Sequence, residues 1–174
     1  MDTYQIMRFL RKDKHAVKTF RGVYSCDNIP RSIPGELPIS FVVNTDPQHQ
    51  EGTHWIAMFI DTVAITVFDS LGCFPSHPIY DGDLLDYVKH IAPIVHYNRA
   101  QVQHSEAVTC GQHACYFVSK MSEKQALRAV MQTYSLDLRQ NDRMVTAFVN
   151  KRKYRRPPVN VYSFCQKCKC VNNQ

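Results

Sequence analysis

The sequence lacks any apolar run approaching the roughly 20 residues that a transmembrane helix needs. Its opening stretch, MDTYQIMRFLRKDKH, carries charges where a secretory signal would need an apolar segment. It also lacks the composition of a disordered chain, since 44% of its 174 residues are hydrophobic. We therefore expect a globular, intracellular protein. The length fits a single domain, residues 1–174, with its own hydrophobic core.

The sequence also lacks an even number of cysteines, which a complete set of disulfides would need. The chain has 7 cysteines, an odd number that excludes complete pairing, so free thiols are expected. Cys165, Cys168 and Cys170 form a C-x2-C-x-C pattern near the end of the chain. This spacing offers three ligands to zinc, but structural zinc sites more often use two separated pairs. We therefore expect tail thiols that are free, or disulfide-bonded after oxidation, and no metal.

Basic residues outnumber acidic ones, 21 to 15. The formal net charge is +6, and the excess is concentrated in KRKYRRPP at 151–158. One interpretation is a solvated helix end followed by a basic, cysteine-rich tail at about 151–174. The other is a nuclear-import signal or a nucleic-acid-binding patch, which would be made by Lys151, Arg152, Lys153, Arg155 and Arg156.

The apolar pattern predicts one α+β domain with a central mixed sheet flanked by helices. Strands are predicted at 20–24, 39–45, 54–61, 63–70, just after Pro93, and at 100–103. Helices are predicted at 3–12, 80–91, 110–121, 123–134 and 137–152. Residues 26–38 read as a loop, Asp137 as a helix N-cap, and Asp61-Thr62 as a tight hairpin turn.

The stretch QHSEAVTCGQHAC at 103–115 places a cysteine where a polar loop becomes an apolar helix. The partial positive charge of a helix N-terminus lowers the pKa of a thiol, which favours the reactive thiolate. Cys110 is therefore a candidate nucleophile. Gly111 beside it leaves room for a substrate backbone to approach.

A nucleophilic thiol needs a base, and the base needs an orienting group. His54 begins one strand of the predicted hairpin and Asp69 ends the other, so hairpin geometry alone places the two side by side. An oxyanion donor is needed as well. Gln103, on the loop before Cys110, is positioned in sequence to fold back and supply it.

Each of these residues also has a structural interpretation. Cys110 fits a small buried apolar residue, His54 an ordinary surface or core histidine, and Asp69 a cap for the turn DSLG. His104 on the loop competes with His54 as the base. His113 is a weaker competitor, because on a helix it would project beside the thiol.

Four segments resemble the adenovirus-type cysteine endopeptidases (adenain), which share a clan with the ubiquitin-like-protein proteases. They are FVVNT at 41–45, GTHWIAMFID at 52–61, FDSLG at 68–72 and QHSEAVTCGQHAC at 103–115. They occur in the family's order of histidine, acid, glutamine and cysteine. The resemblance implies a papain-related fold of the adenain and ubiquitin-like-protease type, and it covers the centre of the chain better than its ends.

Applied residue by residue, the resemblance implies that Cys110 is the nucleophile and His54 its imidazolium partner. It implies that Asp69 orients His54, although adenoviral enzymes mostly carry Glu there and ubiquitin-like proteases carry Asp. Gln103 and the backbone N–H of Cys110 would form the oxyanion hole. Trp55 would shield the site or belong to the core.

The implied function is a viral-type endopeptidase that cleaves precursor proteins through a thioester, after small residues such as Gly, during virion maturation. We expect it in the host nucleus and the virion, as a monomer. The alternative within the same chemistry is a protease for ubiquitin or ubiquitin-like modifiers. The alternative from another class is a non-enzymatic basic DNA-binding module.

The residues themselves require no cofactor, but the resemblance implies stimulation by DNA or by a viral peptide. In adenoviral enzymes that peptide is joined by a disulfide to a cysteine between the acid and the nucleophile. Here the interval contains only Cys73, close after Asp69, which speaks against a covalent peptide. The net charge of +6 permits stimulation by DNA.

Overall fold

A computed structural model describes residues 1–32, 35–73 and 82–153. The basic residues Arg155 and Arg156, the three tail cysteines and the predicted start of the helix at residue 80 lie outside this range. Within it, no helix is both long and apolar enough to cross a lipid bilayer.

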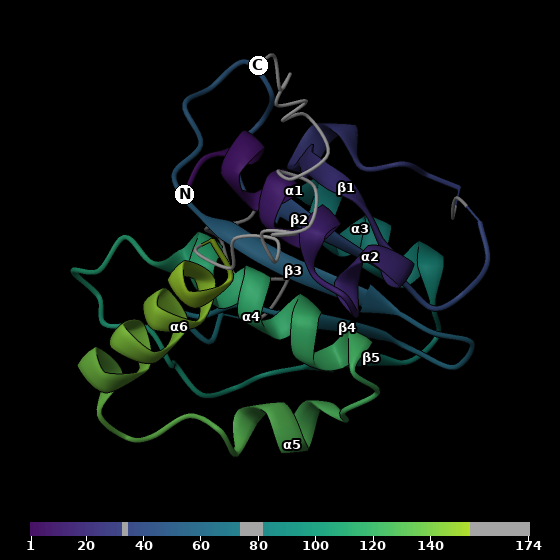
Figure 1. The fold of residues 1–174 in the computed structure, drawn as a ribbon. Helices are drawn as coiled ribbons and strands as arrows, with labels where there is room; N and C mark the ends of the chain where they lie inside the picture. Colours follow the sequence, from purple (N-terminus) through teal and green to yellow (C-terminus); the bar gives the residue numbers. More distant parts are fainter. Residues whose placement is uncertain (33–34, 74–81, 154–174) are drawn as a thin grey trace, which may run out of the picture.

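The centre of the molecule is a five-stranded sheet in the order β1-β2-β3-β4-β5 (Figure 1). The strands are β1 (Phe20–Ser25), β2 (Ile39–Asn44), β3 (Trp55–Ile60), β4 (Ile65–Phe68) and β5 (Val95–Tyr97). The two outer pairs are parallel and the two inner pairs antiparallel, which confirms the predicted mixed sheet. The sheet is therefore centred on the hairpin that carries the predicted histidine and acid.

One predicted strand is wrong. Residues 100–103 form no strand; the N–H groups of Val102 and Gln103 instead both donate to the carbonyl of Ser70, at 2.8 and 3.0 Å. Two donors converging on one acceptor fix a loop at a point, whereas a strand spreads its bonds along a partner. The hairpin turn also differs, since it spans Asp61–Ala64, closed by Asp61 N–H donating to the carbonyl of Ala64 at 3.1 Å.

Helices cover both faces of the sheet (Figure 1). They are α1 (Thr3–Lys12), α2 (Ala16–Thr19), the 3₁₀ turn η1 (Cys26–Asn28), α3 (Gly82–Ile91), α4 (Cys110–Ser122), α5 (Leu127–Met131) and α6 (Leu138–Lys153). The predicted helix at 123–134 is much shorter, because Lys124 takes a left-handed conformation with φ of 64° and reverses the chain after α4. Elements as short as α2 and η1 carry too few residues to show a periodic pattern.

Each face of β3 packs into its own core. Ala57 and Phe59 face α1, α4 and α6, whereas Ile56 and Met58 face the layer that contains α3. All six residues of β3 are buried. A strand covered on both faces is apolar at every position, and this explains the unbroken run WIAMFI. The two layers hold the hairpin rigidly, and with it the ends from which His54 and Asp69 project.

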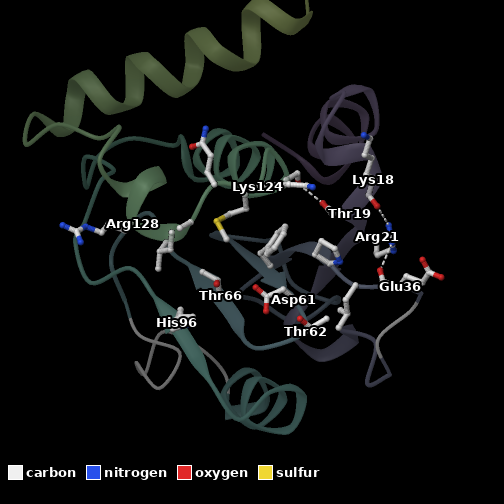
Figure 2. Close-up of a pocket in the computed structure, with 18 residues that line it drawn as sticks. Lys18, Thr19, Arg21, Glu36, Asp61, Thr62, Thr66, His96, Lys124 and Arg128 are labelled. Carbon is white, nitrogen blue, oxygen red and sulfur yellow. Dashed lines mark hydrogen bonds between the residues drawn. The ribbon is translucent and has the colours of Figure 1, made fainter.

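A cavity of about 950 Å³ lies at the far end of β3 from His54 (Figure 2). It opens between the hairpin turn at Asp61 and Thr62, the end of α2 at Lys18, and Arg128 of α5. Phe59, near the end of β3, lines the cavity, whereas His54, Asp69, Gln103 and Cys110 do not. This cavity is therefore separate from the predicted catalytic residues.

Candidate active site

His54 and Asp69 lie side by side at one end of the hairpin. The antiparallel register pairs Ala57 with Phe68, so the residues just before β3 and just after β4 meet at the same edge. His54 Nε2 is 2.7 Å from Asp69 Oδ1, and the two residues are only 5% and 1% exposed. The hairpin geometry that the sequence predicts is therefore present, and the pair is shielded from water.

Asp69 performs two tasks at once. Its Oδ1 also accepts the Leu71 N–H at 2.8 Å, and its backbone carbonyl accepts the Gly72 N–H at 2.9 Å. The capping interpretation and the partner interpretation are therefore compatible. Asn98 holds the backbone of Asp69 from both sides, accepting its N–H at 2.9 Å and donating to its carbonyl. These contacts fix the carboxylate in place, and Asn98 is a residue that sequence reasoning missed.

Cys110 is the first residue of α4, as predicted, and is 9% exposed. Burial is the largest single influence on this thiol and raises its pKa, but the hydrogen bond and the charge of His54 lower it. Backbone N–H groups of Trp55 and Gly111 lower the pKa further, so that it lies below its ordinary value. Cys110 is therefore set up to ionise.

The pKa of His54 moves in the opposite direction. Burial lowers it, but the hydrogen bonds to Asp69 and Cys110 and the negative charges of both raise it to about 9. Because Nε2 is bonded to Asp69, Nδ1 is the ring nitrogen left to face the thiol. A thiol with a lowered pKa beside an imidazole with a raised pKa favours a thiolate–imidazolium pair at neutral pH.

Gln103 is 4% exposed and has a fixed amide orientation. Its Oε1 accepts the Ser70 hydroxyl at 2.7 Å, and its Nε2 donates to the carbonyl of Ala107 at 2.6 Å. This bond uses one of the two amide hydrogens. The side chain is thereby anchored both to the end of the hairpin and to the loop that leads into Cys110.

Trp55 and Gly111 meet the first residue of the chain. The Trp55 indole N–H donates to the carbonyl of Met1 at 2.9 Å, and the Trp55 ring is part of the core. A Cβ at Gly111 would lie 2.9 Å from Met1 Cβ and 3.3 Å from the side chain of Ile6. The missing side chain of Gly111 therefore admits the N-terminal segment, and room for a substrate on another side of it stays a prediction.

The two competing histidines have other partners. His113 is fully buried and binds Asp142 through Nε2 at 3.0 Å and the Tyr134 hydroxyl through Nδ1 at 3.3 Å. Nδ1 of His104 accepts the backbone N–H of Glu106 at 3.3 Å. In the described part of the chain, the histidine that contacts Cys110 is His54.

No group of three or more potential metal ligands occurs among residues 1–32, 35–73 and 82–153. The tail cysteines fall outside that range. Lys151 is exposed on α6, which extends to Lys153 and so includes part of the predicted basic patch.

Sequence reasoning also missed Ser70, Asn141 and Asp142, which hold the loop before Cys110. Their partners lie 29 to 39 residues away along the chain. A single polar residue on a helix carries no periodic signal, so no local pattern in the sequence marks it.

No protein-family model matches this chain. No curated protein matches it either. A crystal structure of the ASFV pS273R protease superposes with a TM-score of 0.58 at 15% identity, over 83% of this chain and 65% of that one. A selenomethionine crystal structure of the same protease gives a TM-score of 0.45 at 20% identity, over 62% of this chain and 43% of that one.

The first of these likenesses establishes the fold. The chain has the α+β architecture of that protease, a mixed five-stranded sheet with helices, and spans 65% of its length.

Proposed function

We propose that this protein is a cysteine endopeptidase with Cys110 as nucleophile, His54 as its acid–base partner and Asp69 as the group that orients His54. The observation that carries the proposal is the connected series of buried contacts from Asp69 through His54 to Cys110, with the pKa of His54 raised to about 9 and that of Cys110 lowered. The fold shared with a protease supports it. A structural cysteine has no need of a charged histidine partner.

The first half of the reaction is acylation. The Cys110 thiolate attacks the peptide carbonyl carbon, a C–S bond forms, and the carbonyl π electrons move to oxygen. The backbone N–H of Cys110 and the second amide hydrogen of Gln103 bind this oxyanion. As the C–N bond breaks, His54 gives its Nδ1 proton to the leaving amine, and a thioester remains on Cys110.

The second half is hydrolysis of the thioester. Neutral His54 takes a proton from water as its oxygen attacks the acyl carbon, and the oxyanion forms again in the same place. Collapse releases the acid product and returns the Cys110 thiolate. Asp69 holds the ring through Nε2 at 2.7 Å in both halves, so that Nδ1 stays directed at the thiol.

The substrates we propose are precursor proteins cut after small residues such as Gly, in virion maturation in the host nucleus and the virion. This part of the proposal is supported by the resemblance of the four sequence segments to adenain. Asp69 supports an alternative substrate class, ubiquitin or ubiquitin-like modifiers, whose proteases carry Asp at this place. Stimulation by DNA through the basic residues from Lys151 onward belongs to the same proposal.

The test is covalent labelling with a peptide probe that ends in Gly-Gly followed by a thiol-reactive electrophile. We expect wild-type protein to be labelled at Cys110, identified by mass spectrometry, and Cys110→Ala and His54→Ala to remain unlabelled. Cys115→Ala is the matched control, because it removes a buried thiol from the same helix and should label normally. Labelling spread over other cysteines and unaffected by His54→Ala would refute the protease and favour the basic binding module.

A second probe separates the substrate classes. A ubiquitin-like protein carrying the same C-terminal electrophile is compared with the short Gly-Gly peptide. Much faster labelling by the protein probe would favour the modifier protease. Equal or slower labelling would favour the precursor endopeptidase. Both probes are repeated with added DNA, since a DNA-stimulated enzyme should label faster in its presence.

A further inference from the structure

Both proposed oxyanion donors depend on one loop. The segment from Val102 to Thr109 carries Gln103 and ends at the N–H of Cys110, where α4 begins. A shift of this loop would move both donors relative to the thiol. Because oxyanion stabilisation depends on donors placed within a few tenths of an ångström, whatever holds this loop controls the reaction.

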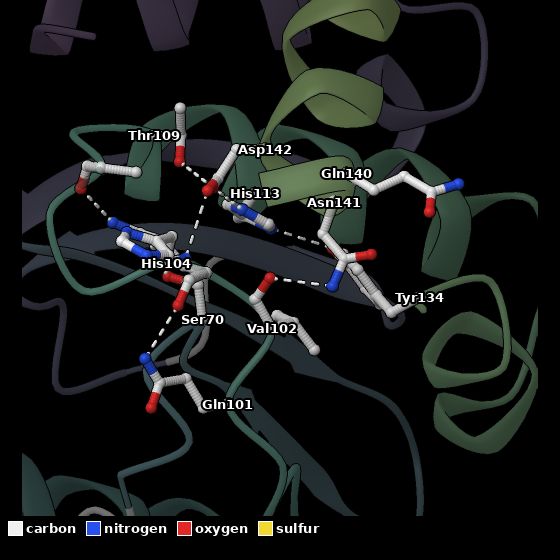
Figure 3. Close-up of polar contacts among 12 residues, drawn as sticks. Ser70, Gln101, Val102, His104, Thr109, His113, Tyr134, Gln140, Asn141 and Asp142 are labelled. Atoms are coloured by element: carbon white, nitrogen blue, oxygen red, sulfur yellow. Dashed lines mark hydrogen bonds and ion pairs between the residues drawn. The ribbon is translucent and has the colours of Figure 1, made fainter. Parts of the chain in front are cut away.

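Helix α6 reaches the loop through two consecutive residues (Figure 3). Asn141 is 1% exposed, and its Nδ2 donates to the carbonyls of Val102 and Ser135, both at 3.0 Å. Its Oδ1 accepts the backbone N–H of Ser135 at 2.9 Å. Asn141 therefore ties the start of the loop to the turn that precedes α6.

Asp142 ties down the end of the same loop. Its Oδ1 accepts the Thr109 hydroxyl at 2.5 Å and lies 3.0 Å from His113 Nε2, and its Oδ2 accepts the His104 backbone N–H at 3.2 Å. Figure 3 shows Thr109, His113 and His104 converging on this one carboxylate. Its side chain is 12% exposed, so water competes little for these bonds.

Neither partner histidine takes part in the chemistry proposed here. His113 is fully buried, and burial together with the charge of His54 lowers its pKa more than Asp142 raises it, so the imidazole is neutral and donates its Nε2 hydrogen to the carboxylate. Thr109, at the N-cap position of α4, makes no side-chain cap bond of its own and uses its hydroxyl for Asp142. The carboxylate thus holds the residue immediately before Cys110.

We propose that Asp142 is a positioning residue that sets the oxyanion hole by fixing the loop from Gln103 to the N-terminus of α4. This inference rests on the proposed protease function. The Asp142 carboxylate contacts Thr109, His104 and His113, and it acts on Gln103 and Cys110 through these residues. Its loss should leave the thiolate intact and weaken the donors that bind the developing oxyanion.

The experiment measures three quantities on purified full-length chain: kcat and KM for a fluorogenic Gly-Gly peptide, affinity for the corresponding peptide aldehyde, and the rate of Cys110 alkylation by iodoacetamide. The aldehyde accepts the thiolate at carbon and places an oxyanion in the hole. Alkylation is a displacement at carbon that needs only the thiolate. The first two quantities therefore depend on the oxyanion hole, and alkylation does not.

For Asp142→Asn we expect kcat and aldehyde affinity each to fall about tenfold, with KM and the alkylation rate nearly unchanged. Asp142→Ala removes all three bonds of the carboxylate, so kcat and aldehyde affinity should fall further. Thr109→Val removes one of these bonds, so both should fall less. Asp137→Ala is the matched control on the same helix: it removes the carboxylate that accepts the Gln140 N–H at 3.1 Å at the start of α6 and does not touch the loop. It should lower the melting temperature but keep kcat.

The inference is overturned if Asp142→Asn and Asp142→Ala keep wild-type kcat and aldehyde affinity. It is also overturned if alkylation falls in parallel with kcat, or if Asp137→Ala reproduces the loss, since both results indicate general destabilisation. A folded wild type that neither cleaves the peptide nor binds the aldehyde overturns the proposed function itself. That result is distinct from an active wild type with an equally active Asp142→Asn.

Discussion

His54 and His113 each bind an aspartate through Nε2, at 2.7 Å to Asp69 and at 3.0 Å to Asp142, and both imidazoles are buried. Their pKa values nevertheless move in opposite directions. That of His54 rises to about 9, whereas that of His113 falls below its ordinary value. The same pairing of histidine with aspartate therefore gives a positively charged histidine at His54 and a neutral, structural histidine at His113.

The difference comes from the remaining neighbours. Besides Asp69, His54 has the Cys110 thiol, and the hydrogen bond and charge of each favour the imidazolium. His113 has one anionic partner, Asp142, which it shares with the Thr109 hydroxyl; its other partner is the Tyr134 hydroxyl, and the positive charge of His54 opposes its protonation. For His113 burial outweighs the single carboxylate. A second anionic partner therefore distinguishes the proposed catalytic pair from the structural one.

The largest effect is expected at the carboxylate of the catalytic pair. Asp69→Asn removes the charge that orients and charges His54, and we expect kcat/KM for the Gly-Gly peptide to fall on the order of 10³-fold. Asp61→Asn is the control, since its exposed carboxylate caps the turn at the other end of the same hairpin. It should change activity less than about twofold, and equal losses in the two variants would contradict the assignment.

An intermediate effect is expected on the pH profile. The active ion pair exists between the lowered pKa of Cys110 and the pKa of His54 at about 9, so activity should rise as the thiol ionises and fall as pH passes about 9. Asp69→Asn removes the group that raises the pKa of His54 most strongly, and should move the alkaline limb to lower pH. Initial rates measured across pH for wild type and Asp69→Asn test this prediction. An alkaline limb at the same pH in both proteins would refute the pairing of His54 with Asp69.

The smallest effect on activity is expected at the structural pair. His113→Gln should keep kcat within about threefold but lower the free energy of unfolding by about 1–3 kcal/mol, because buried hydrogen bonds are lost. The sign with pH follows from the lowered pKa of His113. Its stabilisation is present above the unfolded pKa of about 6.5 and is lost as pH falls through the lower folded value.

Denaturant titrations at neutral and at acid pH check this last prediction. Wild type should lose stability between the two conditions, and the variant should lose less. His54→Gln is the reciprocal comparison, because the stabilisation from a raised pKa is present below about 6.5 and is lost as pH rises through about 9. Identical acid slopes in wild type and His113→Gln would show that His113 is not the neutral, buried group described here.

Local patterns in the sequence predict much of the fold. The runs ISFVVN and WIAMFI predict β2 and β3, and the helix start at Cys110 agrees with the structure. The prediction failed at residues 100–103, where the N–H groups of Val102 and Gln103 both bond to the single carbonyl of Ser70. It also overextended the helix at 123–134, since nothing in the sequence marks Lys124 as left-handed.

The proximity of His54 and Asp69 follows from local sequence alone, because the register of a hairpin is local and brings the start of one strand to the end of the next. Three contacts depend instead on the packing of the whole chain: Cys110 meets His54, Ser70 orients the amide of Gln103, and α6 holds the loop that leads from Gln103 to Cys110. These contacts join segments whose approach depends on how α4 and α6 pack on the sheet. The packing of whole helices is decided by burial of their apolar faces over the entire core. The identity of a single polar residue therefore does not predict which distant segment that residue will contact.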